Sequence, residues 1–203
     1  MSKSSAIQKA IAVFREHNGV LRTAEAIRLG IQPRTLYAMR DSGVVERMAR
    51  GLYRLAELPP LGNPDLVAVA LTAPKSVICL VSALAFHEIT TQVPHEVHIA
   101  VERGKSRRPQ IEHPPVRIFW LGGNAFHEGI DTHVLDGIEV RVYCPEKTVA
   151  DCFKYRNKIG LDVVVEALRL CRQRKRSTVD RLMHFARVDR VENIMRPYLE
   201  AML

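Results

Sequence analysis

Residues 30–55 read GIQPRTLYAMRDSGVVERMARGLYRL, and this stretch decides the expected fold of the N-terminal part of the chain. Gly30 is suited to the left-handed backbone conformation of the residue that ends a helix. Pro33 suits the first turn of the next helix, because its missing N–H has no helical partner there. The pattern predicts a tight turn followed by a helix that ends at Gly43.

The spacing of Leu36 and Met39 lets both side chains face a core from this helix. A helix rotates by about 100° per residue, so the side chains on the opposite face of the helix point to solvent. These outward residues are Arg34, Tyr37, Ala38 and Asp41. The helix therefore offers a polar face to a partner.

After the helix, residues 44–47 and 51–55 are typical of two short strands. The turn between them, at residues 48–50, is basic. Tyr53 is expected to face the core, because alternate residues of a strand point to opposite sides. The prediction here is a β-hairpin with a positively charged tip.

The segment before Gly30 predicts two further helices. Residues 3–19 carry an apolar stripe at helical spacing and close at Asn18-Gly19. Thr23 is placed to cap a short helix over residues 24–29. The inward residues of that short helix would be Ala26, Ile27 and Leu29.

A helix-turn-helix followed by a β-hairpin is the layout of a winged helix-turn-helix domain, which binds double-stranded DNA. An α-helix fits the major groove, where arginine bonds guanine in two places, and basic residues beside it neutralise phosphates. The predicted DNA-binding residues are Arg34, Thr35, Tyr37, Arg40, Arg47, Arg50 and Arg54, with Arg34 and Tyr37 assigned to bases or sugars and the last four to phosphate. The alternative is a small helical domain with a solvated basic face.

The composition is that of a globular protein, and its positive charge is suited to binding a polyanion. The chain has 203 residues, a hydrophobic fraction of 47% and a net charge of +8. Residues 1–58 hold 10 Lys and Arg against 5 Asp and Glu, so the N-terminal quarter is the concentrated basic end. We expect a cytoplasmic protein, because no signal peptide or membrane span is visible. The four scattered cysteines are expected to be reduced structural thiols.

The remainder of the chain is predicted to form a second domain of mixed α and β structure. Pro and Gly residues near position 60 mark a linker, which gives a winged helix-turn-helix domain at 1–58 and a C-terminal domain at 63–203. Asp136-Gly137 lies between two alternating segments and predicts an antiparallel hairpin. Helical patterns follow from residue 145, and Ser177 is expected to cap one of them. The fold class is therefore α+β, with a helical C-terminal part.

No enzyme motif is recognisable in the C-terminal part. GxSxG, GxxxxGK[ST] and HExxH are all absent, and Gly122-Gly123-Asn124 alone indicates a turn. Glu146 and Asp151 near Lys147 would suit a metal-dependent nuclease, but adjacent residues of a helix point about 100° apart, and an acidic first helical turn explains Glu146 more simply. We expect no catalytic residues, no metal and no cofactor.

Two other basic clusters are expected to be solvated surface, or to extend a DNA contact or meet an acidic partner. The first is Arg103, Lys105, Arg107 and Arg108, and the second is Arg169, Arg172, Arg174, Lys175 and Arg176.

The chain resembles the AbiEi abortive-infection antitoxins over nearly its full length. Three segments carry the resemblance, in order RMARGLYRL, SVICLVSALAFHEITTQVPHEVHIAV and PEKTVADCFKYRNKIGLDVVVEAL. The resemblance implies a type IV toxin–antitoxin system, in which the winged helix represses its own operon at inverted repeats in the promoter. It also implies that the C-terminal domain counteracts a nucleotidyltransferase-like toxin, by direct or indirect action. Recognition then falls to residues 33–42 and phosphate contact to residues 47–54.

The sequence departs from a catalytic nuclease pattern, to which the C-terminal fold of the family has been likened. The candidate strand reads Ile138-Glu139-Val140-Arg141, with Arg141 where a lysine is needed. An enzymatic role is therefore disfavoured. Two alternatives stay open, a ligand-sensing winged-helix regulator without a toxin partner and a nuclease-like enzyme. The segments nominated for the antitoxin surface are residues 82–89 and the helix that begins at Glu146.

Overall fold

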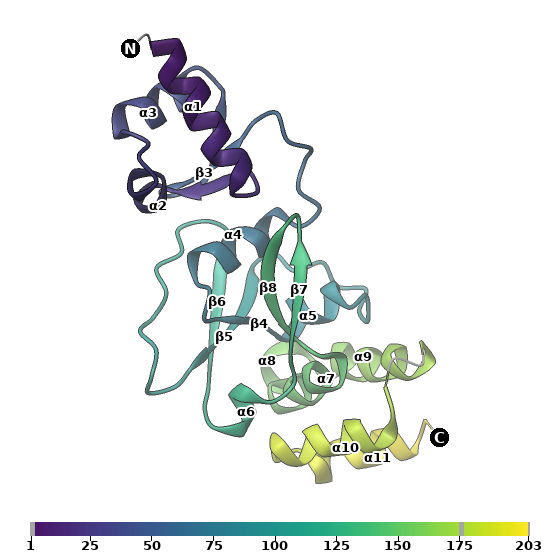
Figure 1. The fold of residues 1–203 in the computed structure, drawn as a ribbon. Helices are drawn as coiled ribbons and strands as arrows, with labels where there is room; N and C mark the ends of the chain where they lie inside the picture. Colours follow the sequence, from purple (N-terminus) through teal and green to yellow (C-terminus); the bar gives the residue numbers. More distant parts are fainter. Residues whose placement is uncertain (1–2, 175–176, 203) are drawn as a thin grey trace.

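The computed structural model describes residues 3–174 and 177–202, and it divides into an N-terminal unit above and a larger C-terminal unit below (Figure 1). The elements of the N-terminal unit are α1 (Lys3–Glu16), β1 (Val20–Arg22), α2 (Thr23–Arg28), α3 (Pro33–Asp41), β2 (Val45–Ala49) and β3 (Leu52–Leu55). The order of helix, helix, turn, helix and hairpin agrees with the sequence prediction.

The ends of α1, α2 and α3 follow the predicted glycine signals. Gly19 has φ 72° and its N–H donates to Phe14 O at 2.7 Å, which closes α1. Gly30 follows α2 with φ 89°, and Pro33 is the first residue of α3. The two glycine positions need a left-handed backbone, which glycine adopts without the steric cost of a Cβ.

The N-terminal sheet contains a strand that the sequence pattern did not predict. Its order is β1-β3-β2, so β3 is the central strand and pairs antiparallel with both neighbours. β1 contributes the buried residues Val20 and Leu21. Three residues are too short a run for alternation to be recognised, and the strand exists because it pairs with β3.

The short helix α2 differs from its prediction at the cap and on its apolar face. Thr23 does not cap the helix; its hydroxyl donates to Gly51 O at 3.3 Å and ties α2 to the hairpin. Ala26 is buried, but Ile27 and Leu29 are 46% and 36% exposed. A helix of six residues turns only a narrow face to the core, so the prediction that Ile27 and Leu29 point inward is wrong.

The C-terminal unit is built on a five-stranded mixed sheet of order β6-β5-β4-β8-β7. Its strands are β4 (Val77–Ile78), β5 (Val97–Glu102), β6 (Val116–Leu121), β7 (Ile130–Leu135) and β8 (Ile138–Tyr143). Its helices are α4 (Pro64–Thr72), α5 (Leu80–Phe86), α6 (Asn124–His127), α7 (Pro145–Lys154), α8 (Arg156–Ile159), α9 (Leu161–Gln173), α10 (Val179–Val188) and α11 (Glu192–Glu200). The predicted hairpin is confirmed as β7 and β8, with Asp136 and Gly137 both at positive φ.

The two faces of the five-stranded sheet belong to two different cores. One face packs on α4 through residues such as Ile99 and Val142. The other packs on α5, α7 and the C-terminal helices, with Tyr143 and Phe153 fully buried. In Figure 1, α7 to α11 gather at the end of the molecule farthest from the N-terminus. Mixed α and β structure is therefore confirmed for the described chain.

Helix α7 is buried on all sides, because every residue from Glu146 to Phe153 is buried. Only the two ends of the helix, Pro145 and Lys154, reach the surface, and residues 146–153 present none to another protein. The nomination of the helix that begins at Glu146 as an antitoxin surface is therefore wrong. Its neighbour α5 packs against α7 and buries Leu80, Ser82, Ala83 and Leu84.

The cap of α10 lies one residue after the predicted position. Thr178, and not Ser177, is the N-cap, and its hydroxyl accepts from Arg181 N at 3.3 Å. Ser177 instead accepts a weak bond from Cys171 Sγ at 3.3 Å. The hydroxyl that reaches the first free N–H groups of the helix is the one that stabilises its start.

Thr178→Ala should lower the free energy of unfolding by about 1 kcal/mol, because it removes this cap. Ser177→Ala is the matched control and should cost less, since its bond with a thiol donor is weak. Urea unfolding of both variants, followed by circular dichroism, measures the difference. Equal losses would show that the Thr178 bond does not stabilise the helix.

Within residues 3–174 and 177–202, no helix combines the length and apolar composition needed to cross a bilayer. All four cysteines are buried, and burial raises the pKa of the Cys144 thiol to about 12.

Candidate nucleic-acid interface

The outer face of α3 carries the side chains that the helical period assigned to it. Leu36 and Met39 are fully buried, while Arg34 is exposed and Tyr37 is 44% exposed. Thr35 is half-buried and, with Arg34, lines a groove between α1 and α3. Apolar packing on one side thus holds the opposite side rigidly toward solvent, as the sequence predicted.

Arg40, Tyr37 and Asp41 form a compact group at the C-terminal half of α3. The Arg40 guanidinium lies over the Tyr37 ring at 5.3 Å and donates to Asp41 Oδ1 at 2.7 and 2.9 Å. This hydrogen bond with Asp41, and the negative charge beside it, raise the pKa of Arg40 above its usual value. Arg40 is therefore charged and oriented, and its charge is partly compensated by a neighbour.

The hairpin places Arg47 and Arg50 at an exposed edge. Arg47 donates to Ala49 O at 3.2 Å across a bulge between Arg47 and Ala49. Strand β2 extends to Ala49, so the turn consists of Arg50 and Gly51 and not of the predicted residues 48–50. Gly51 has φ 68°, a left-handed conformation that glycine adopts without the steric cost of a Cβ.

Arg54 lies inside the unit, in contrast to the other predicted arginines. Its side chain is 6% exposed, and it donates to Glu46 Oε1 at 3.1 Å and to the carbonyls of Leu58 and Pro59. The chain that leaves β3 covers the face on which Arg54 lies, because its carbonyls at Leu58 and Pro59 accept hydrogen bonds from the guanidinium. Arg54 is therefore placed to brace the hairpin and the linker, and we remove it from the set proposed to contact phosphate.

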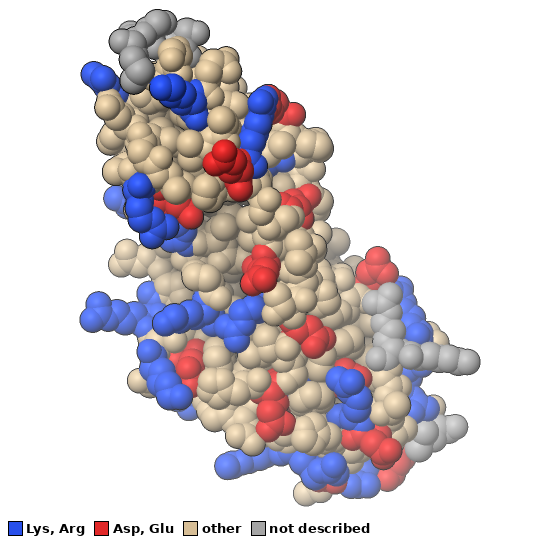
Figure 2. Space-filling model, in the orientation of Figure 1, with Lys and Arg blue, Asp and Glu red and all other residues tan. Residues whose placement is uncertain are grey.

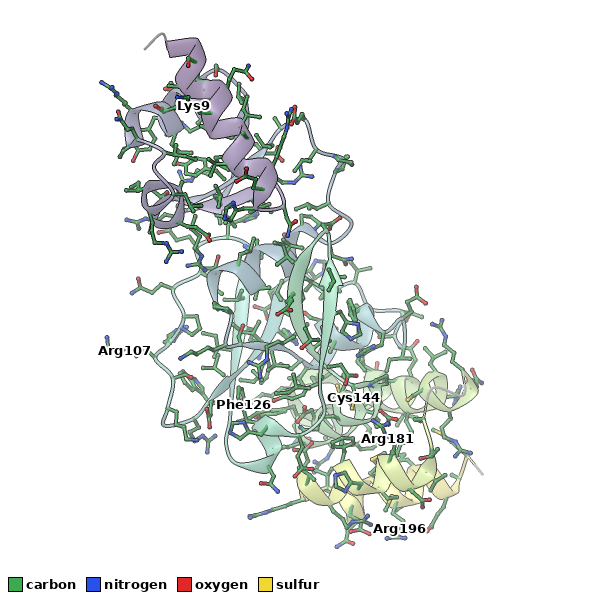
Figure 3. The ribbon with its side chains drawn as sticks, viewed as in Figure 1. Lys9, Arg107, Phe126, Cys144, Arg181 and Arg196 are labelled. Carbon is green, nitrogen blue, oxygen red and sulfur yellow. The ribbon has the colours of Figure 1, made fainter. Side chains whose placement is uncertain are left out.

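The hairpin turn also contacts the C-terminal unit. Arg50 Nη1 lies 2.8 Å from Glu112 Oε1, in the long loop between β5 and β6. This hydrogen bond and the charge of Glu112 raise the pKa of Arg50. Figure 2 shows basic side chains on the side of the N-terminal unit where α2 lies, and again over this loop. Arg107 projects outward from the loop (Figure 3).

Other basic residues of the N-terminal unit were not assigned from the sequence. Arg22 and Arg28 are exposed on β1 and α2, next to the predicted face. The sequence carries one signal for Arg22. The apolar pair Val20-Leu21 directly before it is buried in β1, and the polar residue that follows such a pair lies at the surface. Of the second predicted basic cluster, Arg169 and Arg174 are exposed, while Lys175 and Arg176 lie outside the described residues.

The C-terminal unit contains a buried charge network. Lys147 Nζ lies 2.5 Å from Asp151 Oδ1 and 3.1 Å from Asp189 Oδ2, and all three residues are at most 3% exposed. Burial alone would lower the pKa of Lys147, but the two carboxylates raise it. Burial raises the pKa of Asp151 to about 8. The Lys147 ammonium is therefore held between two carboxylates and has its counter-charge inside the protein.

The residues considered for a nuclease are separated by these pairings. Glu146 is buried and pairs with Arg181 Nε at 3.0 Å, whereas Asp151 pairs with Lys147. In the part of the chain that the structure describes, no three His, Cys, Asp or Glu side chains are grouped to hold a metal ion. On β8, Glu139 is exposed and Arg141 donates to Lys75 O at 2.9 Å.

Comparison with known proteins supports the resemblance for the N-terminal unit. A family model described as "Transcriptional regulator, AbiEi antitoxin" matches residues 8–56, which run from α1 to just past β3. A crystal structure of the RV2827C protein from Mycobacterium tuberculosis shares the fold, with a TM-score of 0.63 at 12% sequence identity. The similarity covers 97% of this chain and 81% of that protein. No curated protein matches the chain.

Proposed function

We propose that this protein is a DNA-binding transcriptional autorepressor and the antitoxin of a bacterial type IV toxin–antitoxin system. The observation that carries the proposal is the family match over residues 8–56, which includes the exposed basic face of α3. That family consists of transcriptional regulators with antitoxin function. Repression of the protein's own promoter, at inverted repeats, extends this general role.

The proposed reader of DNA is a winged helix-turn-helix domain at residues 1–58, with an antitoxin domain at 63–203. The element order and the separate core formed by residues such as Phe14, Leu36 and Leu55 support this division. In this arrangement α3 is the recognition helix, and the hairpin of β2 and β3 is the wing. The linker at 59–62 joins the two parts.

In the proposed complex, α3 enters the major groove and the wing lies on the adjacent backbone. Arg34, Thr35 and Tyr37 then face bases and sugars, because they lie on the exposed or groove-lining side of α3. Arg40, Arg47 and Arg50 face phosphates. Arg40 and Arg50 already carry carboxylate partners, Asp41 and Glu112, which DNA phosphates would replace as the acceptors.

A mobility shift of the intact protein tests the proposal. The probe is the DNA upstream of its own gene, with scrambled DNA of equal length as competitor at fixed salt. We expect a shift that the scrambled competitor does not remove. Equal competition by both DNAs would contradict sequence-specific repression.

Arg47→Gln should weaken binding to all DNA sequences alike and lower the slope of log K against log salt by about one. The reason is that a phosphate contact releases a counterion but carries no base information. Titrations of specific DNA at several salt concentrations measure the slope.

Arg15→Gln is the matched control for Arg47, because Arg15 is also exposed and lies outside the predicted set. Arg15 pairs with Glu57 at 2.9 Å, and this pairing lowers the pKa of Glu57. Its substitution should leave the slope unchanged. Equal slopes for all three proteins would show that Arg47 does not contact phosphate.

The proposed toxin is a nucleotidyltransferase-like protein encoded beside this gene. Expression of the neighbouring gene alone should arrest growth, and co-expression with this protein should restore it. Restoration by a variant that no longer binds DNA would separate the antitoxin role from repression. A gene without such a neighbour would favour the ligand-sensing regulator instead.

A further inference from the structure

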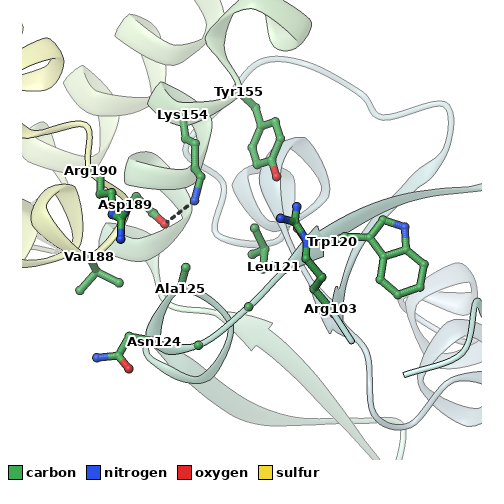
Figure 4. A pocket seen from close by; sticks show the side chains of 12 residues that line it. Arg103, Trp120, Leu121, Asn124, Ala125, Lys154, Tyr155, Val188, Asp189 and Arg190 are labelled. Atoms are coloured by element: carbon green, nitrogen blue, oxygen red, sulfur yellow. Dashed lines mark hydrogen bonds and ion pairs between the residues drawn. The ribbon is translucent and has the colours of Figure 1, made fainter. Parts of the chain in front are cut away.

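A cavity of about 840 Å³ opens in the C-terminal unit, away from the proposed DNA-binding face. It lies where β6, α6, the end of α7 and the turn after α10 meet (Figure 4). Small-molecule sites typically have volumes of about 300–1,000 Å³. The cavity therefore has the size of a ligand site, and nothing in the proposed repressor or antitoxin role uses it.

Three cationic side chains from separate parts of the chain line this cavity. They are Arg103 after β5, Lys154 at the end of α7 and Arg190 after α10. In Figure 4, Lys154 lies between Arg190 and Arg103. Arg103 uses one nitrogen to donate to Trp120 O at 3.0 Å, which fixes its position and leaves other donors for a ligand.

The acidic residue of the lining does not cancel this positive charge. Asp189 is fully buried, and its carboxylate accepts from Lys147 at 3.1 and 3.3 Å and from Lys154 at 3.5 Å. Its charge is therefore neutralised from the interior. Lys154 is 35% exposed and is held at the cavity by this long contact.

The turn at Gly122-Gly123 adds backbone donors to the same wall. The described residues provide no acceptor for the N–H of Gly122 or Gly123. Gly123 has φ 55° and ψ −142°, a conformation that disfavours other residues, and a Cβ added there would meet nothing within 4 Å. Free N–H groups in such a turn form an anion-binding concavity.

One aromatic residue, Tyr155, completes the lining beside Arg103, whereas the Trp120 indole packs with the core on the opposite face of the sheet. Tyr155 is half-buried, and its ring packs on the edge of Phe119 with centroids 5.0 Å apart. A ring held in this way is a fixed surface on which a planar base stacks. Cations and free N–H groups for a phosphate thus lie next to aromatic surface for a base.

We propose that this cavity binds a mononucleotide, with its phosphate at Arg103, Lys154, Arg190 and the Gly122-Gly123 turn, and its base against Tyr155. The site is distinct from the proposed DNA-binding surface. Its occupancy does not depend on repression or antitoxin activity.

Isothermal titration calorimetry of the intact protein tests the site with AMP, inorganic phosphate and adenosine as probes. We expect AMP to bind more tightly than phosphate, and adenosine not to bind at the same concentrations. Arg103→Gln and Arg190→Asn should each weaken AMP about tenfold, because each removes a charged hydrogen-bond donor. Asparagine is chosen because Arg190 has φ 58°, which asparagine tolerates.

Arg117→Gln is the matched control, because Arg117 is an exposed arginine on β6 that does not line the cavity. It should leave AMP affinity unchanged. The proposal is overturned if AMP does not bind, if adenosine binds as well as AMP, or if the control weakens binding as much as Arg103→Gln. Displacement of AMP by a single-stranded oligonucleotide of higher affinity would also overturn the assignment to a small molecule.

Discussion

Lys147→Met should lower the free energy of unfolding of the C-terminal unit by about 3–5 kcal/mol at pH 7. Lys147 is fully buried and lies between Asp151 and Asp189, with its ammonium 4.7 Å from the Tyr143 ring centroid. Methionine fills a similar volume but leaves Asp189 as a buried charge with only the distant Lys154 beside it. Urea unfolding followed by circular dichroism measures the loss.

Three further variants separate the charge effect from simple loss of packing. Lys154→Met should cost less than about 1 kcal/mol, because that ammonium is partly solvated and its contact is long. Asp151→Asn should also cost less than Lys147→Met, since Asp189 still neutralises Lys147. Combining Lys147→Met with Asp189→Asn should recover stability, because no uncompensated charge is left buried. A Lys147→Met protein as stable as the native chain would contradict the network.

Arg34→Ala should weaken binding to the specific operator by about 1–3 kcal/mol and relax the preference for one base pair. This expectation rests on the proposed function. Arg34 is exposed on α3 beside the fully buried Leu36, so its removal changes the surface and leaves the packing intact. Competition mobility shifts with every single-base variant of the operator measure both effects.

The control for Arg34 is Arg196→Ala, which makes the same charge change on α11 at the opposite end of the molecule (Figure 3). Its affinity and base preference should match the native protein. Arg47→Gln provides the second contrast, because it should lower affinity without changing base preference. If Arg34→Ala and Arg47→Gln behave identically, the division between base and phosphate contacts is wrong.

The pairing of the buried charges in the C-terminal unit could not be predicted from the sequence. Glu146 was explained from the sequence as an acidic residue in the first turn of a helix, and no partner was predicted for Lys147 or Asp151. In the structure all three are buried; Glu146 pairs with Arg181, and Lys147 pairs with both Asp151 and Asp189. Lys147 and Asp189 are 42 positions apart, so no local spacing relates them. They meet because α7 packs against α10.

The same contrast appears in the N-terminal unit. The sequence by itself determined α3 and its outward face, because the helical period and the Gly and Pro signals at its ends are local properties of the backbone. The same reasoning located the hairpin turn at Asp136-Gly137, where both residues adopt positive φ.

Only the tertiary structure decided which strand is central, which arginine is enclosed and which carboxylates are paired. Arg54 was expected to face outward, opposite Tyr53, but β3 is flanked by two strands and the departing linker covers its other side. Strand pairing and helix packing depend on contacts between distant segments, and a single sequence does not state which segments meet. For this protein the sequence set the local elements, and packing between them placed the charges.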